Sequence, residues 1–144
     1  ALVDRIAEIL LAPFCDPLLP TLPFRRRLEW LVRQQLAIVG EQRELFVTLA
    51  LDRASMDWQL AGAEDPVGDA YGRWVAAFRE LLEEGIGDGA LRSLDSWNVA
   101  YLVAGALSAT VFRWIRGHLA VPLQDYVPLL LDMLFAGIAP EQEP

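Results

Sequence analysis

Residues 95–116 read DSWNVAYLVAGALSATVFRWIR, and this stretch decides the fold. It holds no charged side chain between Ser96 and Phe112. Apolar and small residues recur at helical spacing along two separate spirals, one starting at Trp97 and the other at Val99. A surface helix needs only one apolar stripe, so a helix with two must be covered on both sides. We therefore expect its own domain to cover one side and another surface to cover the other.

The length and composition of the chain predict one domain with more apolar surface than a monomer of this size buries. Its 144 residues suffice for a single core. Hydrophobic residues make up 54% of the chain, and the mean hydropathy is +0.29. We therefore expect residues 1–144 to form a single domain that has an oligomer interface, a lined pocket or both.

The charge of the chain is acidic throughout. The net charge is −8, and all 12 basic residues are arginines. Residues 1–72 hold 7 Arg and 11 acids and residues 73–144 hold 5 Arg and 9 acids, so each half carries −4. We therefore expect no basic face of the size that DNA binding needs. The one basic cluster, Arg25–Arg27, is either a solvated helix start or a contact for a phosphate or an acidic partner.

The sequence predicts a cytoplasmic protein without a membrane partner. Cys15 is the only cysteine, which excludes an intrachain disulfide and fits a reducing compartment. The longest uncharged run is shorter than the roughly 20 residues of a membrane span, and no signal peptide is evident. The chain starts at Ala1 without an initiator Met, directly in helical periodicity. We expect it to be a piece of a longer protein.

Helical periodicity in the other segments predicts an all-α fold with about six helices. The expected helices are Ala1–Leu11, Phe24–Val39, Glu41–Met56, a segment from Pro66 to the glycines at 85–89, Asp95–Arg116 and Pro122–Ile138. Gly40 is expected to end the second helix, and Ser93 or Asp95 to cap the fifth. No segment alternates as a strand would, and we find no internal repeat.

No group of residues predicts catalysis. His118 is the only histidine, and no carboxylate spacing around it suggests a dyad or a metal site. Cys15 has no nearby histidine or helix N-terminus to activate it. Glu83 and Glu84 are adjacent, so their side chains diverge on a helix. We expect the chain not to be an enzyme and to hold no metal and no cofactor.

Aromatic side chains on several predicted helices form a second pattern. Polar groups share their spirals, and apolar walls with a few convergent polar groups are typical of small-molecule pockets. Ordinary core packing is the alternative for each aromatic residue, although a core avoids unpaired polar groups. The candidate ligand-binding residues are Trp30, Gln34, Phe46, Leu49, Arg53, Trp74, Phe78, Trp97 and Tyr101.

The last two predicted helices favour a homodimer. Ala104 and Ser108 are small enough to let another helix approach, and Leu123–Ile138 is apolar nearly all round. Two helices from each of two chains would form a four-helix bundle, with one large intrachain core as the alternative. The Trp97–Tyr101 end would face the domain's own helices and the Ala104–Ile115 end its symmetry mate. The candidate interface residues are Ala104, Ser108, Val111, Phe112, Ile115, Val127, Leu130, Leu131 and Leu134.

The order of motifs resembles the C-terminal domain of TetR-family transcriptional regulators. Residues 78–94 form an amphipathic pattern that contains LLEEGI and then GALR, followed by the cap Asp95. Leu129–Ile138 is similar to the family's last helix, and Ala1–Ile6 looks like the start of the helix that leaves its DNA-binding domain. The chain departs from the family in having no helix-turn-helix, which would precede Ala1.

The resemblance implies an effector-binding and dimerisation domain of a one-component repressor. Its partners would be a second copy, a small and mostly apolar effector, and operator DNA through the missing N-terminal domain. Residues 1–11 would relay ligand binding to that domain. Arg53 would meet an acidic group on the ligand or pair with Asp57. The alternative is a ligand-free helical module for dimerisation or protein interaction.

Overall fold

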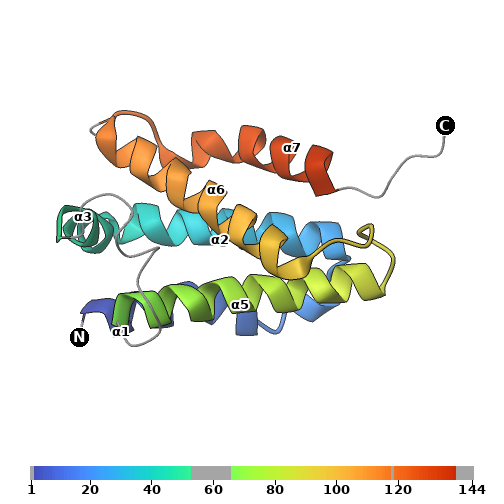
Figure 1. The fold of residues 1–144 in the computed structure, drawn as a ribbon. Coiled ribbons are helices and arrows are strands. Elements are labelled where there is room, and N and C mark those ends of the chain that lie inside the picture. The colour runs from blue at the N-terminus through green and yellow to red at the C-terminus, as the bar shows by residue number, and fades with distance from the viewer. Residues whose placement is uncertain (1, 53–65, 118, 139–144) are drawn as a thin grey trace.

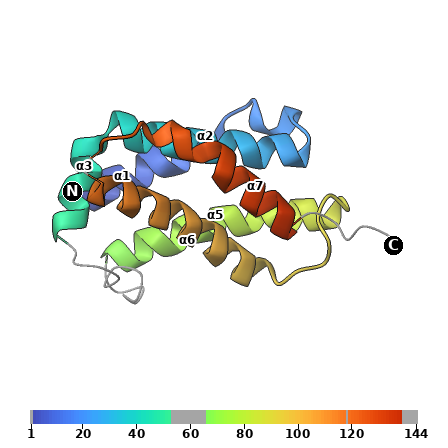
Figure 2. The same ribbon diagram turned by 90° about the horizontal axis from the view of Figure 1, so that it is seen from above.

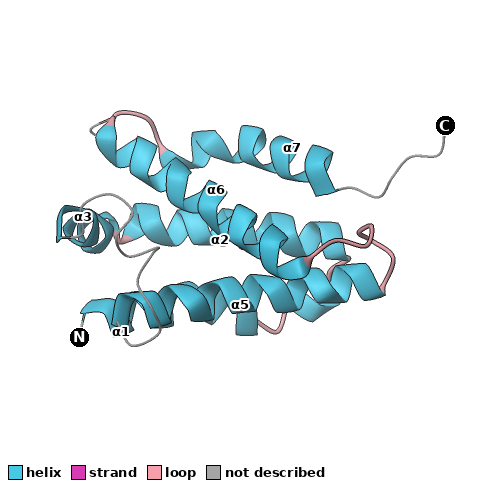
Figure 3. Ribbon diagram, viewed as in Figure 1, coloured by secondary structure: helices cyan, strands magenta, loops and turns pink. Residues whose placement is uncertain are grey.

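The computed structural model describes residues 2–52, 66–117 and 119–138, and in them the chain forms helices joined by loops (Figure 3). In these ranges the α-helices are α1 Leu2–Leu11, α2 Phe24–Glu41, α3 Arg43–Asp52, α5 Pro66–Gly87, α6 Ser96–Arg116 and α7 Val127–Ile138. Three short 3₁₀ turns lie between them, η1 Ala12–Cys15, η2 Leu19–Thr21 and η3 Leu123–Tyr126. The described ranges contain no strand, which confirms the predicted all-α class with about six helices.

Helix α2 is the central element of the domain. It contacts α1, α5, α6 and α7, and Figure 1 shows it between the layer of α1 and α5 and the layer of α7. Its residues Leu28, Leu31 and Val32 are fully enclosed. Seen from above, α7 runs between α2 and α6 (Figure 2). The apolar side chains of α2 therefore form the middle of one continuous core.

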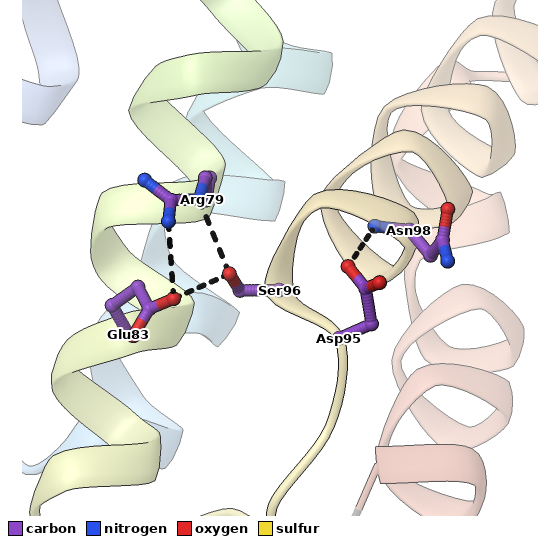
Figure 4. A network of polar contacts seen from close by, with 5 residues as sticks. All are labelled: Arg79, Glu83, Asp95, Ser96 and Asn98. Atoms are coloured by element: carbon purple, nitrogen blue, oxygen red, sulfur yellow. Dashed lines mark hydrogen bonds and ion pairs between the residues drawn. The ribbon is translucent and has the colours of Figure 1, made fainter.

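The start of α6 is fixed by side chains that the sequence places there. Asp95 is the N-cap, and its Oδ1 accepts a hydrogen bond of 3.1 Å from the backbone N–H of Asn98, as predicted (Figure 4). Ser96 donates to Glu83 Oε1 at 2.5 Å and accepts from Arg79 Nε at 3.2 Å (Figure 4). The guanidinium of Arg79 also lies 4.7 Å above the ring of Trp97. This network attaches the first turn of α6 to the last third of α5.

Several helix ends differ from the sequence prediction. Gly40 lies inside α2, which continues to Glu41 and ends at Gln42. The predicted Pro122 helix begins with the turn η3 before α7, whereas α5 does end at Gly87, within the glycines predicted to end it. A glycine costs a helix only about 1 kcal/mol, which packing of the surrounding turns outweighs. A single glycine such as Gly40 is therefore not enough to end a helix.

Helix α6 is, among the described residues, the one helix long and apolar enough to cross a membrane by length and composition. A single such helix is weak evidence, since the core helix of a soluble protein passes the same test. Its residues Ala100, Val103, Ala104 and Leu107 belong to the core of this domain.

Gly85 is required where the end of α5 meets the start of α2. A Cβ atom at this position would lie 2.6–2.9 Å from carbons of the Phe24 ring, which is closer than real Cβ contacts come. Phe24 is itself buried at the first turn of α2. The two helices approach this closely because residue 85 has no side chain.

We predict that Gly85→Ala destabilises the domain by about 1–3 kcal/mol, because the ring of Phe24 must move out of its packed position. Gly87→Ala is the matched control, since nothing lies within 4 Å of its Cβ position on the same helix. The control should leave stability unchanged or raise it slightly. Chemical denaturation of both variants measures the difference, and equal stabilities would contradict the steric explanation.

Candidate functional site

An apolar cavity of about 120 Å³ lies at the end of the domain where α1 and α3 sit (Figure 1). Five helices supply its walls. The lining residues are Val3, Ile6, Ala7 and Leu10 of α1, Gln35, Leu36 and Val39 of α2, Phe46, Leu49 and Ala50 of α3, Ala70, Tyr71 and Trp74 of α5, and Leu107, Ser108, Val111, Phe112 and Ile115 of α6. None of these side chains carries a charge.

The spacing of the lining residues explains how the wall forms. On α1 they recur at positions 3, 6, 7 and 10, and on α6 at positions 107, 108, 111, 112 and 115. These intervals of three and four place the side chains on one face of each helix. One apolar face of α1 and one apolar face of α6 therefore line the same cavity.

Gln35 is the buried polar centre of the site, with an exposed fraction of 1%. Its Nε2 donates a hydrogen bond of 2.9 Å to the backbone carbonyl of Leu10, and its Oε1 accepts one of 3.0 Å from Trp74 Nε1. Buried polar groups need such partners, since an unpaired one costs about 1–3 kcal/mol. One amide thus joins the last turn of α1, the middle of α2 and the first half of α5.

A second polar contact crosses the cavity wall from α5 to α6. Ser108 is buried, and its hydroxyl donates to the carbonyl of Ala104 at 2.9 Å. The hydroxyl of Tyr71 is hydrogen-bonded to Ser108. Burial raises the pKa of the Tyr71 phenol above its ordinary value, and the bond to Ser108 opposes that change. The phenol is therefore neutral at physiological pH.

The structure places the predicted ligand-binding residues in different surroundings. Phe46, Leu49 and Trp74 line the cavity. Arg53 lies outside the described residues. The other candidates do not line the cavity, and these are Trp30, Gln34, Phe78, Trp97 and Tyr101.

The excluded aromatic residues have other roles. Phe78 is fully buried one turn beyond Trp74, with its ring 5.0 Å from that of Phe14 in an edge-to-face arrangement. Trp97 packs against the guanidinium of Arg79 and is 46% exposed, and Tyr101 is 50% exposed. Phe78 is thus core, whereas the other two lie at the surface of α6.

The predicted division of α6 into two ends agrees with the structure for one end and not for the other. The Ala104–Ile115 end faces the interior of its own chain, because Ser108, Val111, Phe112 and Ile115 line the cavity and Ala104 is fully buried. The Trp97–Tyr101 end contacts α5 as predicted, through Arg79 over Trp97 and Tyr71 beside Tyr101, although both aromatic rings are about half exposed. Spacing shows that α6 has two apolar stripes, but it does not show which one faces inwards.

The same correction applies to the predicted interface residues of α7. Val127, Leu130 and Leu131 are buried in the core, and Leu134 is half-buried against it. Leu129 and Met133 are the large apolar side chains of α7 that stand exposed. The candidate interface residues of α7 therefore offer little surface to a partner in this conformation, and dimerisation itself stays a prediction.

Sequence reasoning missed Gln35, Tyr71 and the inward direction of Ser108. A signal for Gln35 was present, because it occupies the apolar stripe of Phe24, Leu28 and Leu31. A polar residue on a buried stripe needs partners, so it indicates an internal hydrogen-bond network.

The basic cluster Arg25–Arg27 is engaged within the chain. Arg25 lies 4.3 Å above the ring of Phe135 on α7. Arg27 donates to the carbonyl of Leu22 at 2.7 Å and to Glu84 Oε2 at 2.9 Å. The arginines thus attach α2 to its neighbours.

Among the described residues no group of three or more His, Cys, Asp or Glu side chains is placed to hold a metal ion.

We predict that Gln35→Met destabilises the domain by about 2 kcal/mol or more, because it leaves the Trp74 N–H and the Leu10 carbonyl without their partner. Gln34→Met, one residue away on the same helix, should change stability by no more than about 0.5 kcal/mol. A double-mutant cycle of Gln35→Met with Trp74→Phe should give a coupling of about 1 kcal/mol in denaturation experiments. Additive effects would contradict the bond as described.

Comparison with known proteins identifies a fold and no family. No family model matches the chain, and no curated protein matches it. Among solved structures, the fatty acid degradation regulator FadR from Bacillus halodurans is similar, with a TM-score of 0.71 and 17% sequence identity. The match covers 94% of this chain and 67% of that one. The chain therefore shares the helical fold of a known regulator.

Proposed function

We propose that this chain is the effector-binding domain of a one-component transcriptional regulator, which senses a small, mostly apolar ligand. The observation that carries this proposal is the apolar cavity among five helices, in a fold similar to that of a known regulator. Small-molecule sites are typically concave and apolar, with a few placed polar groups. Gln35 and Ser108 are polar residues of this kind in the wall of the cavity.

The finer proposal is a TetR-type regulator whose DNA-binding domain lies outside these 144 residues. It rests on the sequence resemblance in the stretch from Phe78 to Asp95 and on the position of α1. Four residues of α1 line the cavity, and its Leu10 carbonyl is bonded to Gln35. A ligand that binds one position of α1 more tightly than another would change the population of the two.

A dimer is part of the proposal, with an interface different from the residues first predicted. Leu102 is 70% exposed on α6, and Leu129 and Met133 are each 66% exposed on α7. Gly105 and Ala109 lie one and two turns along α6 from Leu102. Large exposed apolar side chains beside small ones are typical of a surface that another helix covers. The same face would serve a ligand-free interaction module, so ligand binding separates the two functions.

The effector function predicts that small uncharged hydrophobic compounds bind in the cavity. Val111→Phe, which places a larger side chain in the cavity wall, should weaken binding at least about tenfold in calorimetric titrations. Val47→Phe on α3 is the control, because Val47 is half-buried and does not line the cavity. A broad panel without any binding, or equal binding by Val111→Phe, would favour the interaction module.

The proposed interface predicts a dimer at micromolar concentration. The double variant Leu102→Glu/Met133→Glu should sediment as a monomer of about 16.1 kDa, because charges cannot be buried there unpaired. Leu18→Glu is the control, since Leu18 is 47% exposed and lies between η1 and η2, outside both α6 and α7. A wild-type chain that sediments as a monomer would contradict the proposed dimer interface.

A further inference from the structure

The outward face of α6 changes from apolar to basic along its length. Leu102 and Ala109 are exposed on it, and the exposed Arg113 and Arg116 follow in the last turn of the helix. The intervals of three, four and seven residues place all four on one side of α6. The ion pairs formed between described residues include neither arginine. The apolar stripe therefore ends in two cations that face solvent.

The outward face of α7 carries the opposite charge. Leu129 and Met133 are exposed on it, and the exposed Asp132 lies on the same side of the helix. Asp132 is the one charged residue of α7, and it too is absent from the ion pairs between described residues. A carboxylate that a partner covers loses its hydration, which is costly unless a cation pairs with it. A partner on this face must therefore supply a positive charge.

The basic end of α6 and the acid of α7 lie at different levels of the same chain. The turn η3 contacts α6, which it follows closely in sequence, so α7 begins beside the end of α6 and runs back along it (Figure 1). Arg92, which precedes α6, donates to the carbonyl of Gly137 at 3.4 Å, so α7 ends near the start of α6. Asp132 is in the middle of this path, whereas Arg113 is at its beginning.

A two-fold axis across α6 would bring the two charges together. The same patch then faces itself, and the two α6 helices run in opposite directions. Gly105 and Ala109 suit the crossing point, because a Cβ atom added at Gly105 meets nothing within 4 Å and leaves room for another helix. Arg113 lies about 9 Å along the helix from the midpoint of this pair. It would therefore reach the first half of the partner's α6, where the partner's Asp132 lies.

We propose that α6 and α7 form a self-complementary dimer interface in which Arg113 of each copy pairs with Asp132 of the partner subunit. Two equivalent ion pairs then flank the apolar contact. This rests on the dimer proposed above and adds what selects the partner, because a second copy supplies both charges at the matching spacing. Charges of this kind determine the choice and the orientation of a partner more than they raise affinity.

Charge reversal tests the pair in sedimentation experiments on the chain. Arg113→Asp or Asp132→Arg alone puts like charges together twice in each dimer, and should raise the dimer dissociation constant at least about tenfold. The exchange Arg113→Asp/Asp132→Arg restores opposite charges, so the constant should return to within about threefold of the wild-type value. Single reversals that weaken the dimer without rescue by the exchange would overturn the pair.

Arg43→Asp and Glu80→Arg are the matched controls. They change the net charge by the same amounts at exposed positions of α3 and α5, outside the proposed interface, and should leave the dissociation constant unchanged. If the wild-type chain is a dimer and the reversals at Arg113 and Asp132 act no more strongly than these controls, this inference fails alone. If the wild-type chain is a monomer, the proposed dimer fails with it.

Discussion

The buried amide of Gln35 is the constraint on which the cavity end of the domain depends. Apolar contacts hold helices together but permit sliding, because they have no preferred direction. The two hydrogen bonds of Gln35 are directional, and they connect α1 through Leu10 and α5 through Trp74 to the central helix. Breaking either would leave a buried group unpaired. The positions of α1 and α5 against α2 are therefore fixed together.

Helix α5 carries this constraint to the other side of the cavity. Tyr71 and Trp74 lie three residues apart, so they are neighbours on one face of the helix. Trp74 is bonded to α2, and Tyr71 to Ser108 on α6. Further along α5, Arg79 and Glu83 hold the start of α6 through Ser96 (Figure 4). Polar contacts at two levels thus set the distance between α5 and α6, while apolar side chains fill most of the space between them.

The sequence was sufficient for the class of fold, the positions of the helices and the cap at Asp95, because these depend on local periodicity and local hydrogen bonds. It was insufficient to predict which face of α6 is turned towards the core. Both of its stripes are apolar, and Ala104 looked suitable for a partner helix although it packs in the core of its own domain. Gln34 and not Gln35 was proposed as a ligand-binding residue for the same reason, because the inward face of the helix was misjudged. One residue changes the direction of a side chain by about 100°, so a small error in the helix face moves a residue out of the site.

The corrected direction of α6 alters how ligand and partner would be connected. Ser108 lines the cavity, and Ala109, the next residue, points about 100° away and is exposed. Under the proposed function, a ligand would contact Ser108, and a second copy of the chain would contact Leu102 and Ala109. Both would therefore contact the same turns of α6. Because packed helices shift as rigid bodies, a displacement of α6 by the ligand would appear at the partner face without a chain of intermediate residues. The second apolar stripe of α6 then links the two sites across the width of a single helix.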